Sequence, residues 1–180
     1  MKKTAQIKKS GFTLVELIVV ISIIAILAVV VAIIINPFEI MRRGRDADRL
    51  SHLAQLQQAI AVAVQESTAS AAETLCVNTT APCSGTSDVG SRSNNGSGWV
   101  KVDLSSQQTV AFATLPIDPT NSTTYHYAYC SDGAEWEIDT VLESQRETPK
   151  MAGDGGNDDV VYEVGLNLSL IAASGGSCTY

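Results

Sequence analysis

The residues of this chain that offer the most ligands for a metal ion lie in a glycine-rich stretch, residues 153–159. Four of its side chains carry oxygen: Asp154, Asn157, Asp158 and Asp159. Ca²⁺ takes about six to eight oxygen ligands from a flexible loop, so this composition is compatible with a calcium site, with Asp118 as a candidate ligand from outside the loop. The spacing differs from that of an EF-hand, whose closing glutamate has no counterpart here. A solvated acidic turn is the alternative interpretation.

Four cysteines form the second group with its own chemistry: Cys76, Cys83, Cys130 and Cys178. An even number of cysteines is typical of two disulfides in an oxidising compartment, with three alternative connectivities. We favour the sequential pairing, because Cys76–Cys83 closes a short loop and Cys130–Cys178 ties the C-terminus to the domain. Zinc is the rival, disfavoured because the chain has no CxxC and neither His52 nor His126 lies at ligand spacing from a cysteine.

Catalytic motifs are absent from the sequence. It contains no nucleophile elbow, phosphate-binding loop, zinc-protease helix or dinucleotide fingerprint, and no evident nucleophile accompanies His52 or His126. We therefore expect a protein that is not an enzyme. The formal net charge is -7. An acidic chain without a basic patch repels nucleic-acid backbones, so direct nucleic-acid binding by this chain alone is not expected.

The apolar residues are concentrated near the N-terminus. From Leu17 to Ile35 every residue is apolar except Ser22. As a helix this stretch spans roughly 28 Å, enough to cross a bilayer once. Four lysines precede it, which places the N-terminus in the cytoplasm. A secretory signal has its small-residue cleavage site after the apolar run, whereas here the small residues, Ser10-Gly11, come before it.

The stretch Lys8-Lys9-Ser10-Gly11-Phe12-Thr13-Leu14-Val15-Glu16, followed by the apolar run, closely resembles the class III signal peptide of type IV pilins and pseudopilins. The resemblance implies that a prepilin peptidase cuts after Gly11 and N-methylates Phe12. Cleavage removes four basic side chains and no acid, leaving 8 basic against 19 acidic residues and a net charge of -11. The alternative is that Gly11 simply begins the helix of an uncleaved anchor.

Glu16 is an ionisable residue at the edge of the apolar span, and a carboxylate there needs a partner. The resemblance implies that Glu16 pairs with the amino group of Phe12 in a neighbouring subunit, which sets the axial register of the helices. The residues alone leave another interpretation open. The Glu16 carboxylate can instead reach the lipid headgroups or interact with the positive N-terminal end of the helix dipole.

A helix-breaking pair, Asn36-Pro37, follows the apolar run and predicts a kink at Pro37. The helix then resumes with an apolar stripe: Leu50, Leu53, Leu56, Ile60, Ala63 and Val64. Polar residues are expected away from this stripe: Arg49, Gln55, Gln58 and Glu66. The pattern predicts one helix of about 55 to 60 residues, of which residues 12–35 are the membrane anchor and residues 36–67 an amphipathic half that covers a sheet.

The rest of the chain carries weaker signals. Residues 68–98 are rich in Ser, Thr, Gly and Asn and are expected to form a surface loop, variable in the family, between helix and sheet. Residues 99–180 are expected to hold the antiparallel sheet and a C-terminal loop region. Strands are predicted at Trp99–Leu104 and in a hairpin, Thr124–Cys130 with Trp136–Thr140. The segment Leu115–Pro119 is too rich in proline for a central strand.

These elements together predict an α+β fold, a long N-terminal helix packed on a small antiparallel sheet, which is also the pilin-like fold that the resemblance implies. Major pseudopilins carry a calcium-binding loop in the region of Asp154 to Asp159, so the resemblance also favours calcium there.

Three functions are compatible with this sequence. The first is the major pilin of an extracellular type IV pilus-like filament, which we favour. The second is a major pseudopilin of a type II secretion or DNA-uptake system, and the third is a membrane-tethered binding domain that never polymerises. The resemblance implies further copies of the chain, the prepilin peptidase, and motor and platform proteins as partners. It also implies a single-pass precursor in the cytoplasmic membrane that later becomes part of a filament on the cell surface.

Overall fold

The computed structural model describes residues 11–105, 112–172 and 176–178 of the 180-residue chain. It consists of two units, Met1–Ile40 and Met41–Tyr180. The first unit holds helix α1, Leu14–Ile35, and the start of helix α2, Pro37–Glu66. The second holds the rest of α2 and all the strands. A long N-terminal helical region and a small antiparallel sheet confirm the predicted α+β class.

The helical region is interrupted at one residue. Asn36 ends α1 in the left-handed conformation, with φ 45° and ψ 78°. The ring of Pro37 disfavours a helical backbone at the preceding residue, and asparagine tolerates left-handed angles better than most residues. Pro37 itself opens α2, a position where its missing N–H leaves no hydrogen bond unmade. The break therefore lies where the sequence predicts a kink.

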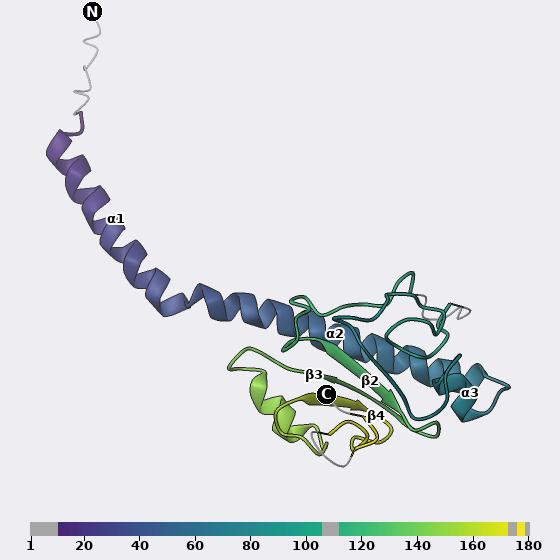
Figure 1. Ribbon diagram of the computed structural model, residues 1–180. Helices are drawn as coiled ribbons and strands as arrows, with labels where there is room; N and C mark the ends of the chain where they lie inside the picture. The colour runs from purple at the N-terminus through teal and green to yellow at the C-terminus, as the bar shows by residue number, and fades with distance from the viewer. Residues whose placement is uncertain (1–10, 106–111, 173–175, 179–180) are drawn as a thin grey trace, which may run out of the picture. The chain divides into compact units, whose positions relative to one another are not determined.

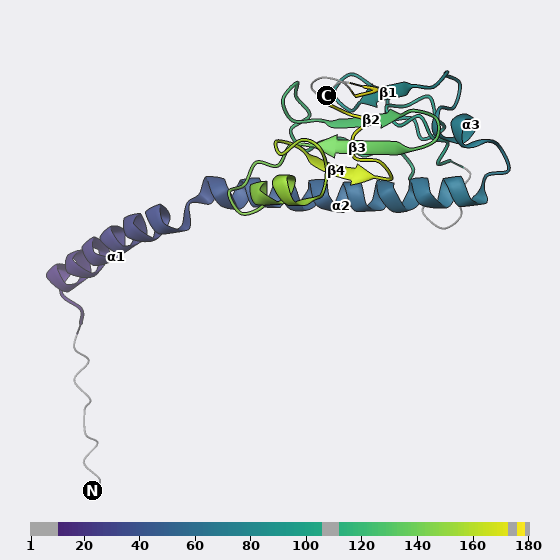
Figure 2. The same cartoon turned by 90° about the horizontal axis from the view of Figure 1, so that it is seen from below.

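The globular unit places α2 along one face of a four-stranded antiparallel sheet (Figures 1 and 2). The strands follow the chain in the order β1, Cys83–Thr86; β2, Tyr127–Ser131; β3, Trp136–Thr140; and β4, Tyr162–Gly165. A short helix α3, Ala71–Leu75, follows α2, and a 3-10 helix η1, Thr148–Gly153, precedes β4.

The core lies between α2 and the sheet. Leu53, Leu56 and Ile60 are fully buried and belong to the same apolar cluster as Tyr127 and Ile138 of the strands. The apolar stripe of α2 thus covers the sheet, as its spacing predicts. Burial of this apolar surface provides the main driving force for folding of the unit.

The expectation that Arg49 lies away from this stripe is wrong. Arg49 is fully buried. It precedes Leu53 by four residues, so it lies on the same face of the helix. Its guanidinium binds three carboxylates there: Asp46, Asp118 and Glu143. A buried charge is tolerated only when it is paired in this way.

The strand predicted at Trp99–Leu104 is not formed. This segment is a largely buried loop. Among the described residues, its one β-bridge is isolated and joins Asp103 to Asn95. The side chains of Trp99 and Leu104 are buried, and Trp99 Nε1 donates to the carbonyl of Pro116 at 2.9 Å. The apolar residues that resemble a strand therefore fill the core from a loop.

The edge of the sheet is occupied instead by β1, which lies inside the stretch predicted to be a surface loop. β1 pairs with β2, and the backbone of Trp99 passes directly over Gly85. A Cβ atom at Gly85 would lie 2.3 Å from the Trp99 carbonyl oxygen, so only glycine fits there. The Trp99 segment therefore lies against β1 and is not itself the edge strand.

The predicted hairpin is confirmed, with one boundary moved. β3 spans Trp136–Thr140 as predicted, whereas β2 begins at Tyr127 rather than Thr124. All ten residues of these two five-residue strands are buried, because both faces of the sheet are covered. On the face away from α2, Ala128 and Cys130 pack against Leu170 and Ile171 of the C-terminal segment.

Candidate functional site

The predicted cleavage site lies in an exposed, non-helical segment. Gly11 and Phe12 precede α1, and Phe12 is 84 % exposed. The leader up to Ser10 lies outside the described residues. An exposed, non-helical peptide bond at a glycine is accessible to a protease, because the absence of Cβ lets another backbone approach closely.

Glu16 has partners within its own chain. Its Oε2 accepts hydrogen bonds from the backbone N and the Oγ1 of Thr13, both at 2.8 Å, and Thr13 Oγ1 accepts from the N of Glu16 at 3.3 Å. This reciprocal pair is a capping box, which satisfies backbone donors at the start of α1. These contacts correspond to the interpretation in which Glu16 stabilises the N-terminal end of its own helix. Pairing with Phe12 of a neighbour stays a prediction.

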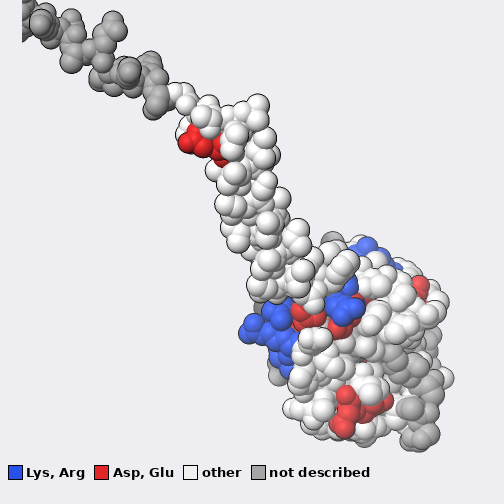
Figure 3. All heavy atoms as spheres, turned by 90° about the vertical axis from the view of Figure 1, so that its left-hand side faces the viewer, with Lys and Arg blue, Asp and Glu red and all other residues white. Residues whose placement is uncertain are grey.

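α1 exposes an apolar surface on every side. None of its 22 residues is buried, and the helix is about 33 Å long. It contains no lysine or arginine, and Figure 3 shows its visible face as an almost uniformly uncharged surface below one acidic group. In the described part of the chain, one helical stretch, Leu14–Glu66, contains a segment long and apolar enough to cross a membrane.

The four cysteines form two disulfides, Cys76–Cys83 and Cys130–Cys178, and none of the four is free. These are the pairs that the sequence favours over zinc ligation. The first joins α3 to the start of β1. The second joins β2 to the C-terminal segment across 48 residues of sequence, and so holds that segment against the sheet.

The predicted calcium residues do not converge on one point. Asp154 accepts hydrogen bonds from the N of Glu163 at 2.9 Å and the N of Gly156 at 3.0 Å. Asp158 accepts from the N of Val160, and Asp159 is exposed. Asp118, the expected outside ligand, is paired with Arg49 instead. The calcium loop of Asp154, Asn157, Asp158 and Asp159 stays a prediction.

A different carboxylate group comes together on the strands. One oxygen each from Glu137, Asp139 and Glu163 lie within 4.8 Å of one another, and all three residues are buried. The sequence alone does not predict this group, which we call the strand carboxylates. The available signal was the alternation of Glu137 and Asp139 within a strand otherwise composed of core residues. Glu163 is brought beside Asp139 only by the pairing of β4 with β3.

The histidines form no catalytic arrangement in the described residues. His52 Nδ1 lies 2.9 Å from the hydroxyl of Tyr127. Burial lowers the pKa of His52 and raises the pKa of Tyr127, so both are neutral near pH 7. His126 lies with Nδ1 3.3 Å from the carbonyl of Ser122. Neither contact holds an activated nucleophile.

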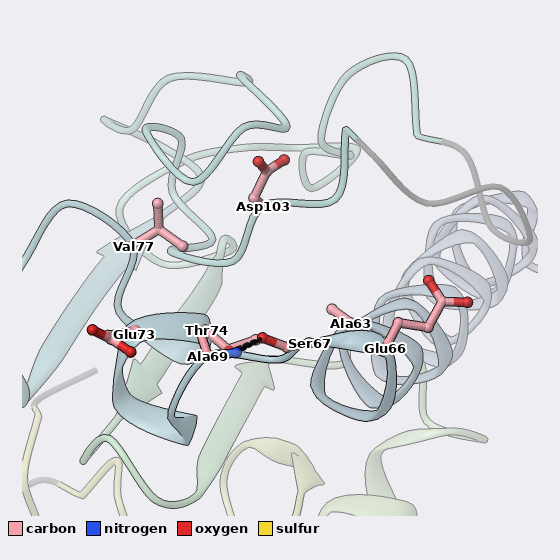
Figure 4. Close-up of a pocket in the computed structure, with 8 residues that line it drawn as sticks. All are labelled: Ala63, Glu66, Ser67, Ala69, Glu73, Thr74, Val77 and Asp103. Atoms are coloured by element: carbon pink, nitrogen blue, oxygen red, sulfur yellow. Dashed lines mark hydrogen bonds between the residues drawn. The ribbon is translucent and has the colours of Figure 1, made fainter.

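A hollow of about 310 Å³ lies beside the C-terminal end of α2 and the start of α3. Figure 4 shows the residues that line it. Its acidic side chains, Glu66, Glu73 and Asp103, do not converge on one point (Figure 4). The carboxylate of Glu73 already caps α3 by accepting from the backbone N of Ser70 at 3.0 Å. The hollow is otherwise lined by small residues: Ala63, Ser67, Ala69, Thr74 and Val77. Nothing in it resembles a catalytic site.

Comparison with known proteins identifies the N-terminal segment. A family model described as the prokaryotic N-terminal methylation motif matches residues 7–32. No curated protein and no solved structure matches the chain. The family that carries this motif is structural rather than catalytic, and the motif together with α1 fits a membrane-anchored precursor. Residues 7–32 thus supply this chain with the class III signal peptide of type IV pilin-like proteins.

Proposed function

We propose that this protein is the structural subunit of an extracellular type IV pilus-like filament, assembled through α1 after cleavage behind Gly11. The observation that carries the proposal is the surface of α1, which is apolar on all sides and which cleavage leaves on the product. A helix of this kind is stable in lipid or among other apolar helices, and not in water.

The mechanism follows from exchanging one apolar environment for another. In the bilayer, lipid chains surround α1. In a filament, copies of α1 pack together in a central bundle, while the acidic, disulfide-bonded domains face the water. The prepilin peptidase that cuts behind Gly11 and methylates Phe12, and the motor and platform proteins that extract subunits from the membrane, are the partners in this proposal. Unwinding at Asn36-Pro37 during assembly belongs to the same proposal.

A major pseudopilin of a secretion or DNA-uptake system is the second candidate, because it needs the same processing and the same helix packing. One observation favours it. The described part of the C-terminal segment is held in place by the Cys130–Cys178 disulfide and by hydrogen bonds from Leu170 and Ile171 to Glu137. A C-terminal segment held against the sheet suits a compact piston. The third candidate, a tethered domain that never polymerises, leaves Glu16 without an intermolecular role.

Mass spectrometry of sheared extracellular material tests this proposal. We expect long fibres built from a chain that begins with N-methylated Phe12. Short, cell-bound assemblies of the same processed chain would favour the pseudopilin. Recovery of intact Met1 in the membrane fraction alone would contradict both and favour the tethered domain. A Gly11→Leu variant is the matched control, because its bulky side chain blocks the cleavage site and keeps the precursor in the membrane.

A further inference from the structure

The strand carboxylates are buried together, and three ionised carboxylates are unstable in such a place without a positive charge nearby. Glu137 and Asp139 are 0 % exposed and Glu163 is 2 % exposed. No ion pair of the described residues includes any of the three. The group therefore needs positive charge, either bound protons or a cation.

The hydrogen bonds around the group leave its inner oxygens without partners. Glu137 Oε2 accepts from the N of Leu170 and the N of Ile171, both at 2.7 Å. The Glu163 carboxylate accepts from the N of Asn157 at 3.3 Å and the N of Asp158 at 3.4 Å. In contrast, Glu137 Oε1 and both carboxylate oxygens of Asp139 are buried with no hydrogen-bond partner. Fully buried polar oxygens without partners are rare in folded proteins and point to a ligand.

We propose that Glu137, Asp139 and Glu163 bind one Ca²⁺ ion between β3, β4 and the C-terminal segment. Two oxygens bound to the same Ca²⁺ can lie up to about 5 Å apart, because each Ca–O distance is about 2.3–2.6 Å. The three carboxylate oxygens meet this limit, since all lie within 4.8 Å of one another. An all-oxygen set is the one that hard cations prefer. This site uses strand residues and is separate from the loop set predicted from the sequence.

The surrounding chain is built to hold these carboxylates in place. The loop of Asp154 to Asp158 closes over Glu163, and a Cβ atom at Gly156 would lie 1.5 Å from Glu163 Oε2. A larger residue at this position would displace the Glu163 carboxylate. On the other side, two backbone donors of the C-terminal segment fix Glu137, and the Cys130–Cys178 disulfide fixes that segment to β2. The ion would therefore fasten the C-terminal segment to the sheet, whether or not the chain polymerises.

Metal content and thermal unfolding of the full-length chain in detergent micelles test the proposal. After EGTA treatment, added Ca²⁺ is expected to bind at one ion per chain and to raise the Tm by several degrees, because it binds only the folded state. Slower hydrogen exchange at the amides of Leu170 and Ile171 should accompany binding. Mg²⁺ is expected to give a smaller Tm increase, because it requires shorter bonds of about 2.0–2.1 Å.

The decisive variant is Asp139→Asn, which keeps the shape of the side chain and removes one ligand charge. It should weaken Ca²⁺ binding on the order of 100-fold while leaving the Tm in EGTA equal to or above that of the wild type, since it also removes repulsion. A variant that merely fails to fold would lower the Tm in EGTA. The matched control, Asp159→Asn, changes an exposed acid of the loop and should keep the full response.

Three outcomes would overturn the proposal. If Asp159→Asn loses the Ca²⁺ response and Asp139→Asn keeps it, the ion sits in the loop. If both variants keep the full response, the ion sits elsewhere. If the wild type neither retains Ca²⁺ nor changes its Tm at millimolar Ca²⁺, protons alone neutralise the strand carboxylates.

Discussion

Arg49 and Asp118, 69 residues apart in sequence, form a fully buried bidentate ion pair, with Nε–Oδ2 at 2.6 Å and Nη2–Oδ1 at 2.9 Å. The same guanidinium binds Asp46 at 2.8 Å and Glu143 at 2.6 Å. Asp46 in turn accepts from the backbone N of Ser144 at 2.7 Å. This network joins α2 to the segment before the hairpin and to the segment after it, and therefore fixes the helix over the sheet.

Replacing Arg49 with Ala should destabilise the globular unit by about 3–5 kcal/mol, because buried carboxylates then lose their counter-charge. Unfolding of the full chain by urea in detergent micelles, followed by the fluorescence of the buried Trp99 and Trp136, measures the change. Arg146→Ala is the control, since the Arg146 side chain is 72 % exposed and should contribute less than about 1 kcal/mol. Equal midpoints for the two variants would contradict the structural role of Arg49.

The acid sensitivity of the protein should depend on Glu143. Its hydrogen bonds with Arg45, together with the contact to Arg49, lower the pKa of Glu143 from 4.5 to about 2. A carboxylate with a lowered folded-state pKa adds stability above its unfolded pKa, and this stability is lost as the pH falls through the folded value. The free energy of unfolding should therefore fall between about pH 4.5 and pH 2.

The Glu143→Gln variant tests this assignment. It should be less stable than the wild type at pH 7 and should show a shallower loss of stability between about pH 4.5 and pH 2. Glu66→Gln, at an exposed position at the end of α2, should follow the wild-type curve. The assignment fails if both variants keep the wild-type slope.

How far the sequence predicts this structure depends on whether the signal is local. The stripe of α2 and the strand β3 follow from periodicity within one segment, and both were predicted correctly. β1 was missed because Cys-Ser-Gly-Thr has no apolar alternation and becomes a strand only beside β2. The burial of Arg49 was missed because its counter-charges, Asp118 and Glu143, are distant in sequence.

The same distinction holds for the candidate sites. The cleavage and methylation motif is contiguous, so the sequence alone identifies it. The strand carboxylates are not contiguous. Glu137 and Asp139 lie on one face of β3, but Glu163 joins them through strand pairing and through a turn in which Gly156 leaves room for its carboxylate. A single sequence does not show which strands pair, so it does not reveal that these distant residues lie together.

The two disulfides should contribute unequally to stability. In the chain-entropy model, closing a loop with a sequence separation of 48 stabilises by about 4 kcal/mol, and closing one with a separation of 7 by about 2.5 kcal/mol. Replacing Cys130 and Cys178 together with serine should therefore lower the urea midpoint more than replacing Cys76 and Cys83. It should also speed hydrogen exchange at the amides of Leu170 and Ile171. A larger loss from the Cys76 and Cys83 pair would contradict this order.

Glu16 has two candidate roles that one substitution cannot separate. Glu16→Ala removes both the capping box with Thr13 and the charge proposed to meet the amino group of Phe12 in the next subunit. Glutamine also serves at the N3 position of a capping box, so Glu16→Gln removes the charge while keeping the cap. Thr13→Ala does the reverse, because it removes the hydroxyl that caps α1 and leaves the carboxylate.

If the charge sets the register, Glu16→Ala and Glu16→Gln should both lower the yield of sheared fibres by more than about tenfold, since an unpaired buried ammonium costs about 3–5 kcal/mol at each contact. Thr13→Ala should assemble with a smaller loss, because a helix cap contributes about 0.5–2 kcal/mol. Fibre yield at equal membrane levels of the processed chain measures the difference. Normal assembly by Glu16→Gln with loss in Glu16→Ala would assign Glu16 to capping, and the register argument would then be abandoned.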